Sequence, residues 1–448
     1  MTVTTAPSVA VADGWRFPSA VEDVLPNGLR MLAYHCPGQY VVSTSLLFDV
    51  PLTVEARELE GVAALTGRTL TQGAAGRSAE DFADALAVCG ADLVAGVTPD
   101  AFAVRLSAPA TRLDPALGLL CDAVQSATFD TNEFEHEKSL RLQEIEQARA
   151  YPQHVAVERL NAALFGEARV ARPSGGDTDS VAAVGRDDVI AYAERYLHPH
   201  RATLVIAGDF ADIDPFALAE RTLGGWSRDG DVAACTEPPQ FSRRPQLILV
   251  DFPEATQSTI RVGGPGVTRA DERWAAMFVA NHAVGGSFSS RINTVLREQK
   301  GVTYGASSSL DTGRGAGVLA VSTAVRSGAT AESIADIVAI LRDANGSLTD
   351  EEVTTGVHAA ADSAALGFER ADAVVGRVEL LLSQGLPLDH VDVNLARIRA
   401  VTTGAANDAY AEIVRPDELT IVVVGDAASL GDSLAAIGYA DVELITPE

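Results

Sequence analysis

The chain has 448 residues, 47% of them hydrophobic, and it carries 61 acidic against 34 basic side chains. This length exceeds what one hydrophobic core usually supports, so we expect two or more domains. The net charge of −27 repels phosphate backbones and anionic membrane surfaces, which argues against nucleic acid and membranes as partners.

The N-terminal residues and the cysteines indicate the cellular compartment of the protein. Residues 1–15 contain no basic cluster followed by an apolar run, so we expect no secretory signal and a flexible arm over residues 1–20. No apolar stretch approaches the ~20 residues that span a bilayer. The cysteines are scattered without a Cys-x-x-Cys pair: Cys36, Cys89, Cys121 and Cys235. This pattern favours a reduced compartment, and we expect a cytoplasmic protein.

Residues 21–226 are expected to form the first of two α/β halves. Asn27 and Gly28 predict a turn before the next strand, and Ser78 is the expected cap of its helix. Hydrophobic periodicity predicts strands at residues 29–34, 41–48, 93–97, 101–107 and 199–208. It predicts helices at residues 58–72, 78–89, 116–126, 132–150, 153–165 and 187–196.

Residues 227–245 mix Gly, Asp, Pro and Arg and are the expected linker to a second half at residues 246–448. There the pattern predicts strands at residues 247–251 and 258–262, helices at 270–283 and 289–300, a hairpin at 304–323, and four or five helices between 329 and 413. Pro199 and Gly208 recur at the same spacing as Pro416 and Gly425. This self-similarity predicts a duplicated α/β unit.

One stretch of the second half combines features of a binding site. Residues 285–304 read Gly-Gly-Ser-Phe-Ser-Ser-Arg-Ile-Asn-Thr-Val-Leu-Arg-Glu-Gln-Lys-Gly-Val-Thr-Tyr. The glycines allow close approach to the backbone, and the serines offer caps for a helix that should stop at Gly301, before a strand that opens at Val302. Arg297 and Tyr304 then flank one helix-to-strand turn, and both can donate to a carbonyl oxygen. The alternative is a surface arginine and a half-buried tyrosine. The expected apolar side of the helix is Phe288, Ile292, Val295 and Leu296.

These residues resemble the C-terminal signature of the pitrilysin/insulinase-type zinc metallopeptidases, in the branch that contains mitochondrial processing peptidase. The resemblance extends over nearly the whole chain. It implies an α+β fold of two homologous halves that form a clamshell around a chamber. It also implies that Arg297 and Tyr304 hold a peptide beside the zinc, and that the adjoining residues contribute to binding it: Gly285, Gly286, Ser287 and Phe288.

The zinc motif of this family is degenerate here. Active members carry His-x-x-Glu-His on the first helix and a further Glu ligand on a later helix. At the positions that match the two histidines and the general base, this chain has Ala64, Arg68 and Gly67. None of the three can bind zinc or take a proton from water, so we expect no metal in this chain and a zinc ion in a partner.

The later helix keeps the family's carboxylates, with Glu144 at the ligand position and Glu137 two turns earlier. If the fold is retained, Arg68 projects toward Glu144, where the dication would lie. We therefore expect a bidentate pair between the Arg68 guanidinium and the Glu144 carboxylate. The alternative is that Glu137, Arg141 and Glu144 form an ordinary set of charges on a helix surface.

The resemblance implies a non-zinc-binding subunit of a heterodimeric zinc endopeptidase, inactive alone. Arg297 and Tyr304 would bind the peptide at a site completed by a homologous partner with an intact His-x-x-Glu-His motif. A leader peptide and a general oligopeptide both remain open as substrates. Two other functions remain open as well, a catalytically silent structural subunit of a family assembly and a stand-alone peptide-binding module.

Overall fold

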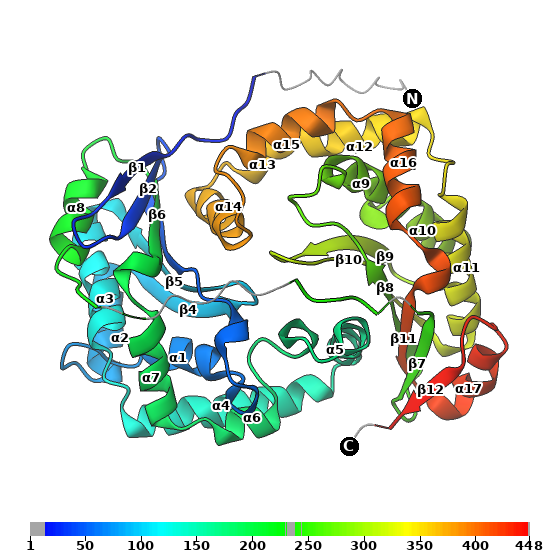
Figure 1. Ribbon diagram of the computed structural model, residues 1–448, viewed down its shortest axis with the longest axis horizontal. Coiled ribbons are helices and arrows are strands. Elements are labelled where there is room, and N and C mark those ends of the chain that lie inside the picture. Colours follow the sequence, from blue (N-terminus) through cyan, green and yellow to red (C-terminus); the bar gives the residue numbers. More distant parts are fainter. Residues whose placement is uncertain (1–13, 229, 231–237, 243, 447–448) are drawn as a thin grey trace, which may run out of the picture.

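The computed structural model describes residues 14–228, 230, 238–242 and 244–446. Most of the expected N-terminal arm lies outside the described residues, as do Cys235 and part of the expected linker. Figure 1 shows two halves, each with one sheet and a set of helices. This arrangement confirms the expected α+β fold with two similar halves.

The first half contains a six-stranded sheet. Its strands are β1 (Val21–Val24), β2 (Arg30–His35), β3 (Val41–Phe48), β4 (Asp92–Thr98), β5 (Ala101–Pro109) and β6 (Ala202–Gly208). They lie in the order β1-β2-β6-β3-β5-β4, and β2 and β6 are the parallel pair among antiparallel neighbours. The predicted turn joins β1 to β2, and Gly28 there has a φ of 86°, which favours glycine.

The helices of this half are α1 (Val62–Leu70), α2 (Ala79–Cys89), α3 (Leu113–Ser126), α4 (Thr131–Arg149), α5 (Pro152–Phe165), α6 (Thr178–Ala183), α7 (Arg186–Tyr196) and α8 (Pro215–Leu223). Ser78 caps α2 as predicted, because its side chain accepts a hydrogen bond from the Asp81 N–H. The helix predicted over residues 58–72 is shorter than expected. Gly61, with a φ of 100°, separates α1 from a preceding 3-10 turn at Arg57–Leu59.

The second half contains a second six-stranded sheet, with strands β7 (Gln246–Asp251), β8 (Gln257–Pro265), β9 (Ala306–Thr312), β10 (Gly317–Arg326), β11 (Thr420–Gly425) and β12 (Val442–Ile445). Its helices are α9 (Trp274–Asn281), α10 (Arg291–Asn293), α11 (Thr330–Asp343), α12 (Asp350–Asp362), α13 (Ala364–Gly367), α14 (Ala371–Ser383), α15 (His390–Arg399), α16 (Thr403–Ile413) and α17 (Ala427–Ala435). Six helices lie between residues 329 and 413, so the prediction of four or five was wrong. The short α13 accounts for part of the difference.

The two sheets share one topology. The second sheet has the order β12-β7-β11-β8-β10-β9, and its last five strands repeat the order β2-β6-β3-β5-β4 of the first sheet. The parallel pair recurs as well, as β2 with β6 and β7 with β11. Gly208 and Gly425 end equivalent central strands. The repeat in the sequence therefore corresponds to a repeat in the fold.

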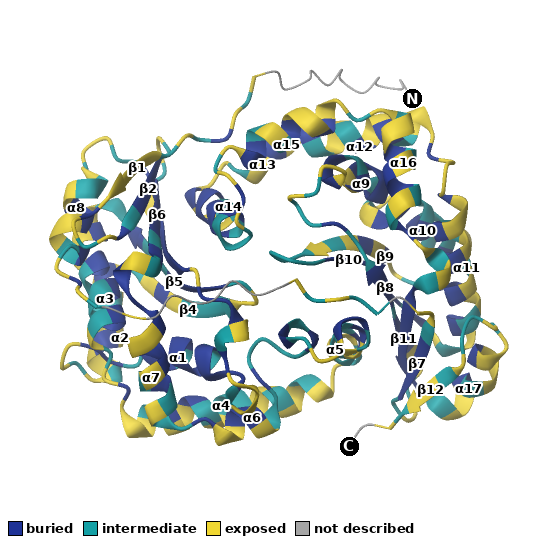
Figure 2. Ribbon diagram, viewed as in Figure 1, coloured by how far each residue is buried: buried dark blue, intermediate teal, exposed yellow. Residues whose placement is uncertain are grey.

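Each half covers the sheet of the other half with one helix. Helix α5 of the first half packs Leu160 and Leu164 against β7 and β11. Helix α14 of the second half packs Val374 and Val378 against β2 and β6. Figure 1 shows α5 and α14 in the middle of the molecule, and Figure 2 shows that most residues of the central strands are buried. This exchange joins the two halves through apolar surface, which stabilises their association by roughly 25 cal/mol per Å² buried.

Ion pairs add polar contacts between the halves. The Arg105 guanidinium on β5 donates to both carboxylate oxygens of Glu379 on α14, at 2.7–3.0 Å. Arg314, in the turn between β9 and β10, pairs with Asp49, and its N–H donates to the Asp100 carboxylate at 2.9 Å. The tip of the second half's hairpin is thereby held on the first half.

Candidate functional site

Three side chains from α1 and α4 meet at the point where the zinc motif would lie. Arg68 donates from Nη1 and Nη2 to the two carboxylate oxygens of Glu144, at 3.1 and 3.0 Å, and from Nε to Glu137 at 2.8 Å. The predicted bidentate pair is therefore confirmed. Burial lowers the pKa of Arg68, but the hydrogen bonds to Glu144 and Glu137 outweigh it and raise that pKa overall.

Glu137 is not an ordinary charge on the helix surface, as the alternative interpretation expected. Its side chain is only 12% exposed, and its second oxygen accepts a hydrogen bond from Gln72 at 3.0 Å. Arg141, one turn before Glu144, contacts that carboxylate at 3.4 Å and the Gly175 carbonyl at 3.1 Å. Both carboxylates are therefore neutralised by protein cations and amides.

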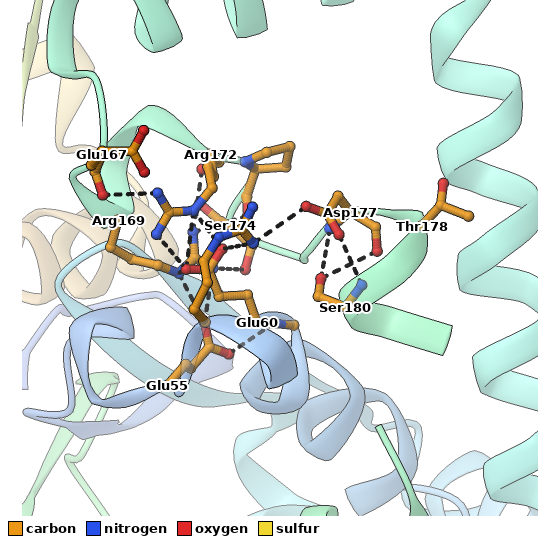
Figure 3. Close-up of polar contacts among 12 residues, drawn as sticks. Glu55, Glu60, Glu167, Arg169, Arg172, Ser174, Asp177, Thr178 and Ser180 are labelled. Atoms are coloured by element: carbon orange, nitrogen blue, oxygen red, sulfur yellow. Dashed lines mark hydrogen bonds and ion pairs between the residues drawn. The ribbon is translucent and has the colours of Figure 1, made fainter. Parts of the chain in front are cut away.

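A buried charge network fixes the start of α1 (Figure 3). The Glu55 carboxylate accepts hydrogen bonds from the N–H groups of Gly61 and Ala63 and from Arg169. Glu55 and Arg169 side chains are 0% and 6% exposed, and burial raises the pKa of Glu55 against the opposing effect of Arg169. Beside them Arg172 donates to both oxygens of Glu60. The network was not predicted, because its residues are far apart in the sequence and match no motif.

The Arg297 and Tyr304 segment is built differently from the prediction. The helix expected over residues 289–300 begins with the short α10 and continues as a π-helical turn at Thr294–Gln299. A second π-helical turn, His282–Gly286, follows α9. Ile292 and Leu296 are buried as expected. The strand begins at Ala306 rather than Val302, so Tyr304 lies in the connecting loop.

Both candidate donors reach the surface. Tyr304 is 95% exposed, so the alternative of a half-buried tyrosine is wrong. The Arg297 guanidinium lies over the Phe288 ring, 4.2 Å from its centroid, and pairs with Glu298. Phe288 was expected on the buried side of the helix, but it precedes α10 and is 71% exposed.

The two glycines of this segment have neighbours within the protein. A Cβ on Gly285 would lie 2.3 Å from the Ser308 hydroxyl oxygen, and one on Gly286 would lie 3.0 Å from the Asn281 side chain. Ser308 donates to the Asn281 side-chain oxygen at 2.5 Å. Close packing against β9 therefore explains Gly285. Gly286 is exposed, and the adjoining Ser287 is half-buried.

The two candidate sites lie in different halves. Figure 1 shows α1 and α4 in the lower part of the first half, and α10 in the second half on the opposite side of the molecule. Within one chain, α10, after which Arg297 and Tyr304 follow in the sequence, therefore lies apart from α1 and α4, which carry Arg68 and Glu144.

A cavity of about 890 Å³ lies between the halves, where the family resemblance implied a chamber, but the residues that line it were not predicted. Its walls come from β5, α14, the end of α5 and the β9–β10 turn. The ion pair of Arg105 with Glu379 and the hydrogen bond from the Arg314 backbone N–H to Asp100 lie along it. Leu47, Phe165 and Leu380 supply apolar surface. No short motif in the sequence marks these positions, because they converge only after the halves associate.

Two family models match consecutive parts of the chain. Residues 30–178 match "Insulinase (Peptidase family M16)", and residues 183–359 match "Peptidase M16 inactive domain". The chain belongs to the M16 family. It is 26% identical over 394 residues to the "Uncharacterized zinc protease SCO5738" of Streptomyces coelicolor, covering 84% of this chain and 83% of that protein. It is 24% identical over 396 residues to YmxG of Bacillus subtilis, also called an uncharacterized zinc protease, covering 86% and 95%.

Other M16 similarities concern assemblies and solved structures. Human cytochrome b-c1 complex subunit 1 is 25% identical over 270 residues, covering 60% of this chain and 56% of that protein. An M16 inactive-domain structure from Pseudomonas fluorescens superposes with a TM-score of 0.82 at 21% identity, covering 91% and 98%. A chain of complex III2 from Candida albicans superposes at 0.77 with 15% identity, covering 93% and 99%. The structural matches support the same fold.

The residues of this M16 chain do not fit the zinc ion that the family motif binds. Such a site needs two imidazoles and a carboxylate around one open position. Here Ala64 offers no ligand, and the Arg68 guanidinium occupies the acceptor oxygens of Glu144. Among the residues that the structure describes, no group of three or more His, Cys, Asp or Glu is placed to hold a metal ion. In the same part of the chain, no helix is both long and apolar enough to cross a bilayer.

Proposed function

We propose that this protein is the non-zinc-binding subunit of a heterodimeric M16 endopeptidase. Its partner would be a homologous chain with an intact His-x-x-Glu-His motif, and the two would complete one active site. The observation that carries the proposal is the contrast between the two candidate sites. The Arg68 guanidinium neutralises Glu144 where zinc would lie, whereas Tyr304 and Phe288 remain exposed to a partner.

Arg297 and Tyr304 would act on the peptide backbone in this complex. The Phe288 ring holds the Arg297 guanidinium by a cation–π contact of 4.2 Å, which limits the orientations of its N–H groups. The Tyr304 hydroxyl is free to turn toward a carbonyl oxygen. Donors fixed near the scissile carbonyl stabilise charge that develops there, typically by ~10²–10³-fold in kcat for one donor. Gly286, Ser287 and Phe288 would line the approach, and Gly285 would support them through its packing.

The substrate would be an unfolded or short peptide, such as a leader peptide, and we place the complex in the cytoplasm. Cys36, Cys89 and Cys121 are unpaired, which supports a reducing compartment. The relatives named zinc proteases support a peptidase context.

The test is to mix the purified chain with a zinc-bearing M16 partner and to measure peptide cleavage with and without a chelator. We expect cleavage only from the mixture, and a loss of at least ~10-fold in kcat/KM for Arg297→Ala and for Tyr304→Phe. Arg326→Ala, an exposed arginine of the same half, is the matched control and should leave the rate unchanged.

The second candidate is a structural subunit without a part in catalysis. The similarity to cytochrome b-c1 complex subunit 1 favours it. It predicts that the partner forms a complex with this chain but cleaves equally well with Arg297→Ala and Tyr304→Phe. A stand-alone peptide-binding module would instead bind peptide with no zinc-bearing partner present.

A further inference from the structure

A group of basic side chains gathers in the second half, and none of them belongs to the sites described above. It consists of Arg269 in the loop between β8 and α9, Arg377 on α14, and His390 and Arg397 on α15. We call these four residues the basic cluster. The charges of Arg269, Arg377 and Arg397 each act on His390, and that of Arg377 acts on Arg269. Helices α14 and α15 also share one hydrophobic cluster, through Val378 and Leu395, so three separate segments bring positive charges together.

The basic cluster contains buried nitrogen atoms that have no hydrogen-bond partner among the described residues. Arg269 Nε and His390 Nε2 are buried, and neither forms a hydrogen bond. His390 as a whole is only 8% exposed. The Arg269 guanidinium lies 4.6 Å from the Trp274 ring centroid, and that of Arg377 lies 5.1 Å from the Phe368 ring centroid. These aromatic rings cover the flat faces of the two guanidiniums, and the N–H edges are left for an acceptor.

No carboxylate of the described residues neutralises this charge. Asp389 is the acidic group that acts on His390, and it is exposed. Asp392, on the same helix, has its Oδ1 occupied by the Phe17 N–H at 2.9 Å. Elsewhere the fold supplies a partner to a buried arginine, as Glu55 does for Arg169. Buried donors without acceptors are rare, and an external ion is one of the standard reasons for them.

We propose that the basic cluster is a binding site for an oxyanion of the carboxylate or phosphate class. Arg269 and Arg377 keep part of their surface exposed, so an anion can reach their N–H edges from solvent. It would accept charge-assisted hydrogen bonds from the two guanidiniums and from His390. Because α14 also covers the first sheet, the bound anion would lie where the two halves join. This site is independent of the proposed peptidase role.

Burial and the positive neighbours lower the pKa of His390, which disfavours the charged imidazole in the absence of a ligand. A bound anion would raise that pKa, because it favours the charged imidazole. The His390 imidazole signals in an NMR pH titration should therefore shift to a higher midpoint when sulfate is added. An unchanged midpoint at a sulfate concentration that stabilises the protein would overturn the assignment to this cluster.

The main test is thermal unfolding of the full chain at constant ionic strength, with chloride replaced by sulfate or by acetate. We expect one of the oxyanions to raise Tm. The gain in the free energy of unfolding should follow RT ln(1 + [L]/Kd), so above Kd it grows with the logarithm of the oxyanion concentration. Arg377→Gln and Arg269→Gln should each lose this increment, and Arg112→Gln, an exposed arginine of the first half, should retain it. Having both cluster variants keeps the test valid if one of them does not fold.

A third arm distinguishes a free ion from a peptide terminus. A short neutral peptide with a free C-terminal carboxylate is compared with its C-terminal amide. If the free acid alone raises Tm, the site takes a peptide carboxylate, and if sulfate alone does so, it takes a free oxyanion. The proposal is overturned if no oxyanion exceeds chloride, or if the increment survives in both cluster variants. None of these results depends on peptide cleavage.

Discussion

At the scale of single residues, Arg68 forms a charge pair at the position where the family resemblance implies a zinc ligand. The guanidinium makes hydrogen bonds with both Glu137 and Glu144, so it takes over the neutralising role of a dication. Residue spacing and the family resemblance were sufficient to predict the Glu144 contact. The contact to Glu137 was missed, because the sequence did not show that this carboxylate is buried.

Arg68→Ala should destabilise the fold, because it leaves the buried Glu137 with Gln72 as its remaining partner. We expect the free energy of unfolding to fall by ~1–3 kcal/mol, measured by denaturant titration at neutral pH. Arg77→Ala is the control, since its pair with Asp122 is more exposed and should contribute no more than ~1 kcal/mol. Equal losses in the two variants would contradict the structural role assigned to Arg68.

At the scale of elements, the segment around Gly285 and Arg297 departs from regular helix geometry. One π-helical turn replaces most of the helix expected at residues 289–300, and another follows α9. Such turns are frequent at functional sites. Hydrophobic periodicity predicted that Ile292 and Leu296 are buried, because both helix types place them inward. It could not predict the π turns, the exposure of Phe288 or the loop at Tyr304. A shift of one residue in the helical register changes each of these features.

Gly285→Ala tests whether this glycine serves packing or peptide approach. Its Cβ would lie 2.3 Å from the Ser308 hydroxyl oxygen, so we expect a loss of ~1–3 kcal/mol in the free energy of unfolding. Gly305→Ala, in the same segment, has no neighbour within 4 Å of its added Cβ and should change stability by less than ~1 kcal/mol. A stable Gly285→Ala protein would show that packing does not require the glycine.

At the scale of the whole molecule, the exchange of α5 and α14 makes the two halves interdependent. The sequence predicted a helix at residues 153–165 and helices between residues 329 and 413, and the repeat predicted two similar halves. The sequence did not indicate which surface each helix covers, because an apolar face fits either sheet. The domain boundaries at residues 21–226 and 246–448 remain a proposal.

Cleavage at a protease site inserted within residues 227–245 should leave the two halves associated. The apolar contacts of α5 and α14 hold them without a covalent connection, and the fragments should elute together in gel filtration. Val378→Asp, which places a charge in the α14 contact, should separate the cleaved fragments, whereas Val393→Asp on α15, 39% exposed, should not. Separation of the unsubstituted fragments would contradict this description.

The central claim is that this chain offers a surface for a peptide but cannot bind the zinc that activates water. The most direct measurement is the zinc content of the purified chain after equilibration with zinc and dialysis. We predict no stoichiometric zinc in the native chain, and zinc retention by Ala64→His/Arg68→His, which places two imidazoles one helical turn apart near Glu144. Stoichiometric, tightly held zinc in the native chain would contradict the account.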